Sequence, residues 1–359
     1  MIKKLLLILA FVNFNMLAAQ VPFTDNGIRY QITSGSTVGV IDNFPDYYSG
    51  SVTIPETVIY NGTPYEVTSI EDFAFESCIY LTNISIPNTV TYIGQHAFFA
   101  CASLTNITIP NSVTSIESFT FAECSSLTGI TIPNSVTYIG ESAFLNCSLL
   151  KDITIPNSVT SIGEEAFNSC VSLTDITIPN SVTFIGSYAF YFCTGLTSLS
   201  IPNSVTSIGS FSFSNCSSLT SLVCAIETPL IIDPSVFNFV NKTTCSLTVP
   251  TASLNDYLIA GVWKDFNSIV GSNTLNTPDF FANDNVSLYP NPFTSDLFLE
   301  FNNGNEKNVK VINSNGEVVI TKTINGLSNS IGTSILSSGI YVVTIKSDEG
   351  TITKKVIKN

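Results

Sequence analysis

A repeat of 23 residues constrains the fold of this 359-residue chain more than any other feature of its sequence. Prolines and cysteines both recur at this interval: Pro87, Pro110, Pro133, Pro156, Pro179 and Pro202, and Cys78, Cys101, Cys124, Cys147, Cys170, Cys193 and Cys216. A fixed period of this length is typical of solenoids, in which each repeat packs only against its neighbours. The sequence therefore predicts a stack of coils instead of a compact globular domain.

The apolar pattern within one repeat predicts how each coil is built. Ile107 and Ile109 alternate with polar residues, which indicates a short strand with one face inside the coil. Pro110 follows directly, and because proline has no amide hydrogen it marks the end of the strand. A second apolar pair follows in Val-Thr-x-Ile, and the closing Ala-Phe-x-x-Cys has the spacing of a short helical turn. Neighbouring coils are expected to pair as parallel sheets around one continuous core.

These repeats resemble the BspA-like leucine-rich repeats, whose signature is similar to L-x-x-I-x-I-P-x-x-V-x-x-I-G-x-x-A-F-x-x-C. The resemblance extends from Ile54 to Leu222, and Glu117 departs from the glycine found at this position in most other coils. It implies a repeat solenoid with one strand and one short helical turn per coil. We expect an N-terminal cap, the repeats and a closing repeat at residues 20–50, 51–222 and 223–270.

The two ends of the chain have features of an exported protein. Residues 1–19 combine Lys3 and Lys4, a short apolar run and a small-residue site, as in a secretory signal peptide. The apolar run is too short to span a membrane. After a polar linker at residues 271–284, strand-like runs separated by Asn and Gly predict a small all-β, Ig-like sandwich at residues 285–359.

The tail resembles the C-terminal sorting domain of the type IX (Por) secretion system. The resemblance rests on three motifs: Tyr-Pro-Asn-Pro-Phe, Ser-Gly-Ile-Tyr and the closing Lys-Lys-Val-Ile-Lys-Asn. The residues that carry it are Tyr289, Pro290, Asn291, Pro292, Gly339, Tyr341, Lys354 and Lys355. The resemblance implies that the tail contacts the type IX machinery. This machinery would carry the protein across the outer membrane of a Gram-negative bacterium, to the medium or the cell surface. A sandwich that itself binds a ligand is the alternative interpretation.

The charge of the chain restricts the classes of partner that it can bind. The formal net charge is −14, and removal of Lys3 and Lys4 with the signal peptide makes it −16. Residues 51–222 contain twelve acidic residues and one basic residue, Lys151. A surface this poor in Lys and Arg does not attract phosphate backbones or anionic lipids. We therefore expect no nucleic acid partner and no direct membrane insertion.

The repeated cysteines predict buried thiols and neither a metal site nor a series of disulfides. Equivalent residues of stacked strands lie about 4.8 Å apart, but their side chains run parallel and do not converge. Cys224 and Cys245 lie outside the repeat beside strand-like runs, so they are candidates for one disulfide or for two further free thiols. Asp152 and Asp175 are expected to be neighbours, but calcium takes six to eight oxygen ligands, so no metal site is predicted.

The inventory of reactive residues argues against catalysis. His96 is the only histidine, and it occupies a column that varies from coil to coil. Cys101 lies five residues later but belongs to the buried set, so no activated pair is expected. The carboxylates of Glu164 and Glu165 are adjacent in sequence and point in different directions. The sequence thus predicts no enzyme and no cofactor.

Two exposed columns remain as candidate ligand-binding surfaces. Small polar residues follow the first strand of successive coils: Asn106, Thr108, Thr131, Asp152, Thr154, Asp175 and Thr177. Tyr92, Tyr138 and Phe184 place an aromatic residue on every second coil. Aromatic faces stack on sugar rings or anchor a protein partner. Alternatively, polar residues simply suit an exposed sheet, and the aromatic rings cover the edge of the core.

These features together predict a secreted or cell-surface, non-enzymatic binding protein that presents a repetitive solenoid surface to an extracellular protein or polymer. The BspA-like resemblance implies adhesion. The alternatives are an accessory polysaccharide-binding protein for nutrient capture and a rigid surface spacer. A hydrolase with an unrecognised site is a more distant alternative.

Overall fold

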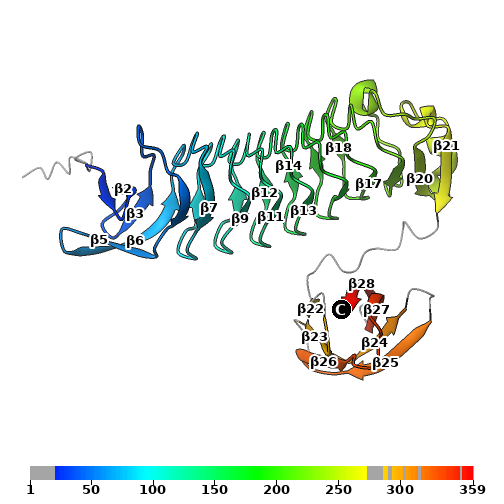
Figure 1. Ribbon diagram of the computed structural model, residues 1–359. Coiled ribbons are helices and arrows are strands. Elements are labelled where there is room, and N and C mark those ends of the chain that lie inside the picture. The colour runs from blue at the N-terminus through cyan, green and yellow to red at the C-terminus, as the bar shows by residue number, and fades with distance from the viewer. Residues whose placement is uncertain are drawn as a thin grey trace, which may run out of the picture.

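The computed structural model describes residues 21–272, 286–289, 293–301, 305–313, 317–347 and 350–358. Residues 21–272 form an elongated stack of coils (Figure 1). A single hydrophobic core extends through this stack, from Phe23 to Phe266. The predicted repeat solenoid is confirmed.

Antiparallel strands cover the N-terminal end of the stack (Figure 1). They are β1 (Phe23–Asp25), β2 (Ile28–Ile32), β3 (Thr37–Val40), β5 (Thr57–Tyr60) and β6 (Thr63–Ile70). The strand pairing changes from antiparallel to parallel at β6, which pairs in parallel with β3 and with β8 (Tyr92–Ile93). In the same way β4 (Gly50–Thr53) pairs in parallel with β7 (Leu81–Ser85). The N-terminal strands therefore continue into the coils without a break in the core.

Most coils contribute one strand to each of two parallel sides. The first side contains β7, β9 (Asn106–Thr108), β11 (Gly129–Thr131), β13 (Asp152–Thr154), β15 (Asp175–Thr177), β17 (Ser198–Ile201), β19 (Ser221–Cys224), β20 (Ser246–Pro250) and β21 (Ser268–Ser272). The second contains β8, β10 (Ser115–Ile116), β12 (Tyr138–Ile139), β14 (Ser161–Ile162), β16 (Phe184–Ile185) and β18 (Ser207–Ile208). Equivalent residues pair directly, as when Ile130 lies opposite Ile107 and Ile153. The 23-residue period thus fixes the register.

The third side of each coil differs from the helical turn that the spacing predicted. The Ala-Phe-x-x-Cys segment forms successive turns in which two residues per coil adopt positive φ, such as His96 at 55° and Ala100 at 58°. The amide groups of His96, Phe98 and Ala100 donate hydrogen bonds to carbonyl oxygens of the next coil. A helix would direct these amides to carbonyls within its own segment. The turns therefore link neighbouring coils on this side as well.

A stack of phenylalanine rings forms the centre of the core. Its members are fully buried: Phe75, Phe98, Phe121, Phe144, Phe167, Phe190, Phe213 and Phe237. Successive ring centroids lie 5.1–5.7 Å apart, with interplanar angles of 4–12°. Tyr48 contacts Phe75 at one end, and Trp263 and Phe266 meet Phe237 edge-on at the other. Aromatic residues of the end segments therefore terminate the stack.

Buried thiols and hydroxyls connect each coil to the one before it. Thiols from Cys101 to Cys216 donate to phenylalanine carbonyl oxygens of the stack at 3.1–3.3 Å. The serine or threonine after the Pro-Asn pair of the coils, such as Ser135, donates to a valine carbonyl of the preceding coil. Burial raises the pKa of Cys170 and Cys216 to about 12. The thiols along the repeat are free and buried, as predicted.

The closing segment is irregular and well packed. It contains η1 (Pro234–Phe237), η2 (Thr251–Ser253), α1 (Leu254–Tyr257) and η3 (Trp263–Asp265) between its strands. The buried indole of Trp263 donates from Nε1 to the carbonyl oxygen of Leu230 at 2.9 Å. The hydroxyl of Tyr257 donates to the carbonyl oxygen of Ile226 at 2.8 Å. Through these two hydrogen bonds, Tyr257 and Trp263 attach the loop after β19, which contains Ile226 and Leu230, to the closing segment.

Of the two alternatives for Cys224 and Cys245, the structure has two free, buried thiols and no disulfide. Parallel pairing places Ser221 opposite Ser246, so Cys245 precedes this pair by one residue and Cys224 follows it by three. This offset separates the cysteines by about 13 Å along the strands. A disulfide needs Cα atoms within about 7 Å. Instead, the sulfur of Cys224 lies 3.2 Å from the hydroxyl of Tyr257.

The C-terminal region has a core of its own, which includes Leu297, Val309 and Val343. One antiparallel sheet contains β22 (Val286–Tyr289), β23 (Asp296–Phe301) and β26 (Ser328–Gly332). The other contains β24 (Lys307–Ile312), β25 (Val318–Ile324), β27 (Gly339–Ser347) and β28 (Gly350–Lys358). The predicted small all-β unit is confirmed. Across all the segments that the structure describes, no helix combines the length and apolar character needed to cross a membrane.

Glycine in the Ile-Gly column permits the close approach of successive coils. A Cβ atom added at Gly163 would lie 2.6 Å from the carbonyl carbon of Gly140. We expect Gly163→Ala to destabilise the solenoid by about 1–3 kcal/mol, because backbone atoms would have to move. Urea unfolding followed by circular dichroism measures this change. Gly261→Ala is the matched control, since a Cβ there meets nothing within 4 Å; equal losses in both variants would contradict the explanation.

Thiol counting tests the corrected cysteine assignment. The chain contains nine cysteines, and all are free and buried. Protein purified without reductant should therefore expose nine reactive thiols in denaturant and essentially none when native. A count of seven in denaturant would restore the Cys224–Cys245 disulfide. A sample reduced beforehand calibrates the full count.

Candidate binding surface

The aromatic column lies on the outer face of the second side of the solenoid. Tyr92, Tyr138 and Phe184 are 38%, 39% and 44% exposed, and each precedes a buried isoleucine in a two-residue strand. In-register pairing places a serine strand position between successive aromatic positions, as Ser161 lies between Tyr138 and Phe184. The aromatic rings are therefore two coils apart, about 10 Å. The structure brings the three predicted residues onto one surface.

The environment of this column is acidic. The hydroxyl of Tyr92 donates to Oδ1 of Asp72 at 3.0 Å. Burial raises the pKa of Tyr92 to about 12, and the hydrogen bond and charge of Asp72 add to the shift. Burial also raises the pKa of Tyr138, with further contributions from Glu117 and Glu141. Both phenols therefore stay neutral at physiological pH, and the single hydroxyl proton of Tyr92 is already donated to Asp72.

The polar column lies on the outer face of the first side. The side chains of Asn106, Thr108, Thr131, Thr154, Asp175 and Thr177 are exposed, whereas the side chain of Asp152 lies outside the described set. Asp175 accepts a hydrogen bond from Ser198 at 2.5 Å. No group of three His, Cys, Asp or Glu residues suited to a metal ion occurs in the described part of the chain. This column offers small hydrogen-bonding groups without a concentrated site.

A further aromatic column lies on the third side of the coils and was not predicted from the sequence. The ring of His96 is stacked between Phe73 and Phe119, with centroid distances of 4.9 and 4.7 Å. Tyr188 stacks on Phe211 at 4.9 Å in the same column. All these residues have positive φ, a conformation that the repeat pattern does not reveal. The signal that was available is the enrichment of aromatic residues at the position that His96 occupies.

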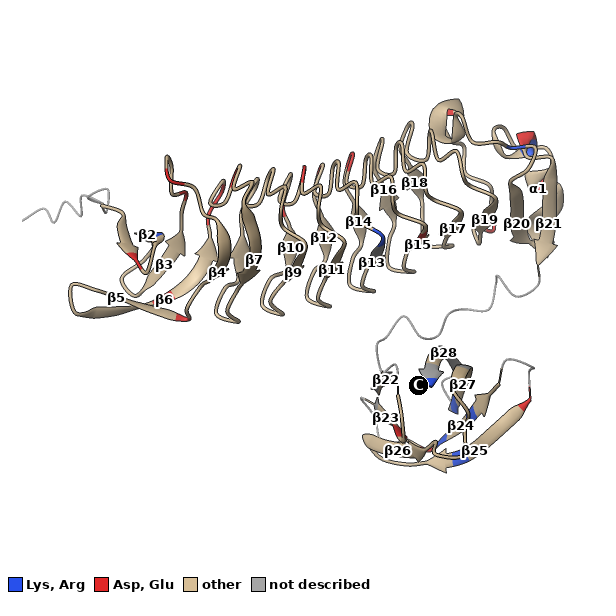
Figure 2. Cartoon of the chain, in the orientation of Figure 1, with Lys and Arg blue, Asp and Glu red and all other residues tan. Residues whose placement is uncertain are grey.

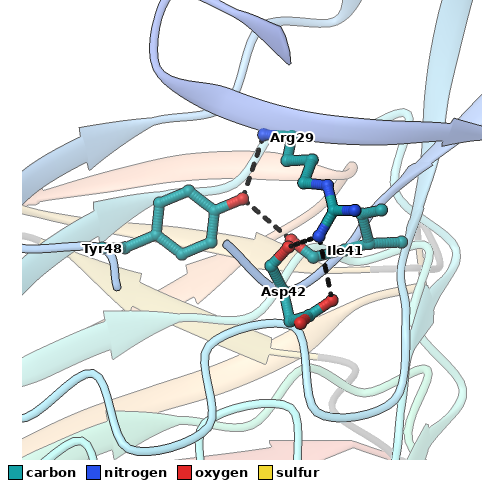
Figure 3. Close-up of polar contacts among 4 residues, drawn as sticks. All are labelled: Arg29, Ile41, Asp42 and Tyr48. Atoms are coloured by element: carbon teal, nitrogen blue, oxygen red, sulfur yellow. Dashed lines mark hydrogen bonds and ion pairs between the residues drawn. The ribbon is translucent and has the colours of Figure 1, made fainter. Parts of the chain in front are cut away.

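The loop between β3 and β4 packs against the first coil near this column. The hydroxyl of Tyr48 accepts a hydrogen bond from the amide of Arg29 and donates to the carbonyl oxygen of Ile41 (Figure 3). Nη1 of Arg29 donates to the carbonyl oxygen of Asp42 at 3.2 Å and lies 3.7 Å from its Oδ1. The ring of Tyr48 lies 4.5 Å from that of Phe75. This network attaches the loop to the end of the phenylalanine stack.

The sorting residues are described only in part. Pro290, Asn291 and Pro292 lie outside the described residues, as do the side chains of Tyr289, Lys354 and Lys355. Gly339 has a φ of +156°, near extended geometry, at the start of β27. Tyr341 is buried, and its hydroxyl donates to the carbonyl oxygen of Ser337 at 2.8 Å. This bond closes the turn that precedes β27.

Two family models match the chain. The model of the BspA type leucine-rich repeat region matches residues 62–173 and 148–261. This is more than half of the chain, so the protein belongs to the BspA-type leucine-rich repeat family. The model of the secretion system C-terminal sorting domain matches residues 287–359. The tail is therefore a Por secretion sorting domain, which directs the protein across the outer membrane to the cell surface through the type IX machinery.

Several solved structures are similar to the chain. A leucine-rich cell surface protein from Faecalibacterium prausnitzii is 23% identical, with 71% of this chain and 96% of that chain covered and a TM-score of 0.40. A leucine-rich repeat protein from Bacteroides ovatus is 23% identical, with coverage of 70% and 91% and a TM-score of 0.38. The T. pallidum leucine-rich repeat protein is 29% identical, with coverage of 55% and 80% and a TM-score of 0.40. No curated protein matches the chain.

The raised pKa of Tyr92 predicts a pH effect on stability. In the folded protein this phenol keeps its proton to about pH 12, whereas in the unfolded chain it ionises near its ordinary value of 10.0. The stabilisation is therefore complete below pH 10 and is lost as pH rises from about 10 to about 12. Tyr92→Phe should flatten the decline in unfolding free energy over this window, as measured by urea unfolding at several pH values. Tyr80→Phe, at a position that is 71% exposed, is the control; an equal effect there would contradict the assignment.

Proposed function

We propose that this cell-surface protein is a non-enzymatic binding and adhesion protein whose solenoid presents the Tyr92, Tyr138 and Phe184 column to an extracellular protein or polymer. The observation that carries the proposal is the exposure of these three rings, which lie between 38% and 44%, on a side whose isoleucines are all buried. Exposed aromatic residues at regular intervals are suited to act as binding anchors.

The rigidity of the scaffold supports this proposal. The strands that carry Tyr138 and Phe184 pair with both neighbouring strands, so each ring is displayed from a backbone fixed on two sides. Because little conformational freedom remains to be lost, binding carries a small ordering cost. The acidic surroundings favour ligands that are neutral or cationic. A protein partner therefore has to present a neutral or basic face to this column.

The two ends have a supporting role in this proposal. We assign residues 20–50 and 223–270 as caps that protect the open ends of the sheets, because an unpaired strand edge invites association with other chains. The expected linker at residues 271–284 begins within β21, which ends at Ser272, and residues 273–284 lie outside the described residues. Polysaccharide capture is the second candidate, favoured by the exposed rings of Tyr92 and Tyr138, which can stack on sugar rings.

A binding screen tests the proposal. The purified chain and the variant Tyr92→Ser, Tyr138→Ser, Phe184→Ser are applied to arrays of glycans and of extracellular matrix proteins. Serine is compatible with the fold because Ser115, Ser161 and Ser207 occupy the equivalent positions of the alternate coils. We expect the variant to lose at least tenfold in affinity for the ligand found, since aromatic anchors typically contribute ~2 kcal/mol or more each.

The control is a variant with the same number of exposed apolar residues removed elsewhere, Tyr80→Ser, Leu149→Ser and Phe239→Ser, at positions that are 71%, 45% and 76% exposed. This control should bind as the original protein does. Equal binding by both variants would place the ligand on another surface. Absence of any ligand on both arrays would favour the spacer alternative.

A further inference from the structure

The loop that Tyr48 anchors and the third side of the first coil border a partly open hollow of about 180 Å³. Three aromatic residues line it, Phe44, Tyr47 and Phe73, together with the polar side chains of Asp42, Glu76 and Ser77. This hollow lies on a different side of the coil from the column proposed for adhesion. It is therefore a separate candidate site.

The aromatic walls are exposed, and each ring packs against another ring. Phe44, Tyr47 and Phe73 are 68%, 44% and 44% exposed. The rings of Phe44 and Tyr47 meet edge-on at 5.9 Å. Phe73 stacks on His96 at 4.9 Å, so its ring is supported from behind. Exposed aromatic area on such fixed supports is typical of a binding site.

The polar part of the hollow is acidic. Asp42 is partly neutralised by Arg29 at 3.7 Å. Among the described residues the ion pairs are this one and Lys242–Asp265, so Glu76 has no ion-pair partner there. The sequence has no Lys or Arg between Arg29 and Lys151, and acidic segments predominate along this part of the solenoid (Figure 2). The hollow therefore has an electrostatic preference for a cation.

The combination of aromatic rings and carboxylates defines the chemistry of the ligand. A cation over an aromatic face is attracted by the ring quadrupole, and a carboxylate adds a direct charge interaction. Carboxylate and serine oxygens also accept hydrogen bonds, which a primary ammonium group with its three donors can supply. A quaternary ammonium group has no such donors. We propose that this hollow binds the ammonium group of a lysine side chain on a protein partner.

Peptide binding tests this proposal on the full purified chain. The probe is a fluorescent pentapeptide with one lysine between glycines, compared with the same peptide acetylated on the lysine Nζ, and binding is measured by fluorescence polarisation. We expect acetylation to weaken binding at least tenfold, because it removes the charge and two of the three donors. Equal binding of both peptides would overturn the proposal. Stronger competition by tetramethylammonium than by butylammonium would overturn the choice of a primary ammonium.

Matched variants locate the site. Glu76→Gln and Phe73→Ser should each weaken binding of the lysine peptide by about threefold or more. Serine fits the Phe73 position because Ser142 occupies the same column with the same positive φ. Phe192→Ser is the control, since it removes an exposed aromatic residue with positive φ from another coil. Unchanged affinity in both hollow variants, with folding confirmed by circular dichroism, would overturn the proposal without affecting the proposed role of Tyr92, Tyr138 and Phe184.

Discussion

The whole solenoid depends on in-register contact between identical positions of successive coils. Most interior side chains lie against the same or a similar residue above and below, which restricts each column to residues that pack well in such a stack. Phenylalanine satisfies this condition through parallel rings about 5 Å apart. Cysteine and serine satisfy it by donating to carbonyl oxygens of an earlier coil. Glycine satisfies it at positions such as Gly163, where an added Cβ atom would lie 2.6 Å from the backbone of the preceding coil.

This condition explains why the ends of the stack depart from the repeat. A terminal coil has a neighbour on one side only, and its exposed ring would lose roughly 1.5–3 kcal/mol of burial. Tyr48 covers Phe75 at the N-terminal end, and Trp263 and Phe266 cover Phe237 at the C-terminal end. Each of these covering residues meets its phenylalanine at a large angle. A tilted or edge-on contact ends the stack, because it leaves no parallel face for another ring.

The same condition decides how much of the fold could be predicted from the sequence. The strands and the buried column of Cys147 follow from period and polarity, and they are found as expected. The third side was not predictable, because positive φ at residues such as His96 and Glu165 is intrinsically disfavoured and persists only through hydrogen bonds to the next coil. Local spacing alone indicates a helical turn there. The cysteines of the closing repeat could not be placed either, since no period defines their register.

The candidate sites lie where this condition does not apply. Outward positions have no copy to fit against, so the Tyr92 column alternates aromatic residues with serine while its inward neighbours remain isoleucine. The aromatic column could be predicted for this reason. The hollow beside Phe73 could not, because it requires the nonperiodic loop around Phe44 to fold over the first coil. Specific recognition is favoured at a place that differs from its surroundings, and a repetitive solenoid offers such a place where the repeat meets a segment outside it. The N-terminal junction is one such place, and its aromatic and acidic lining makes it chemically distinct from the polar faces of the coils.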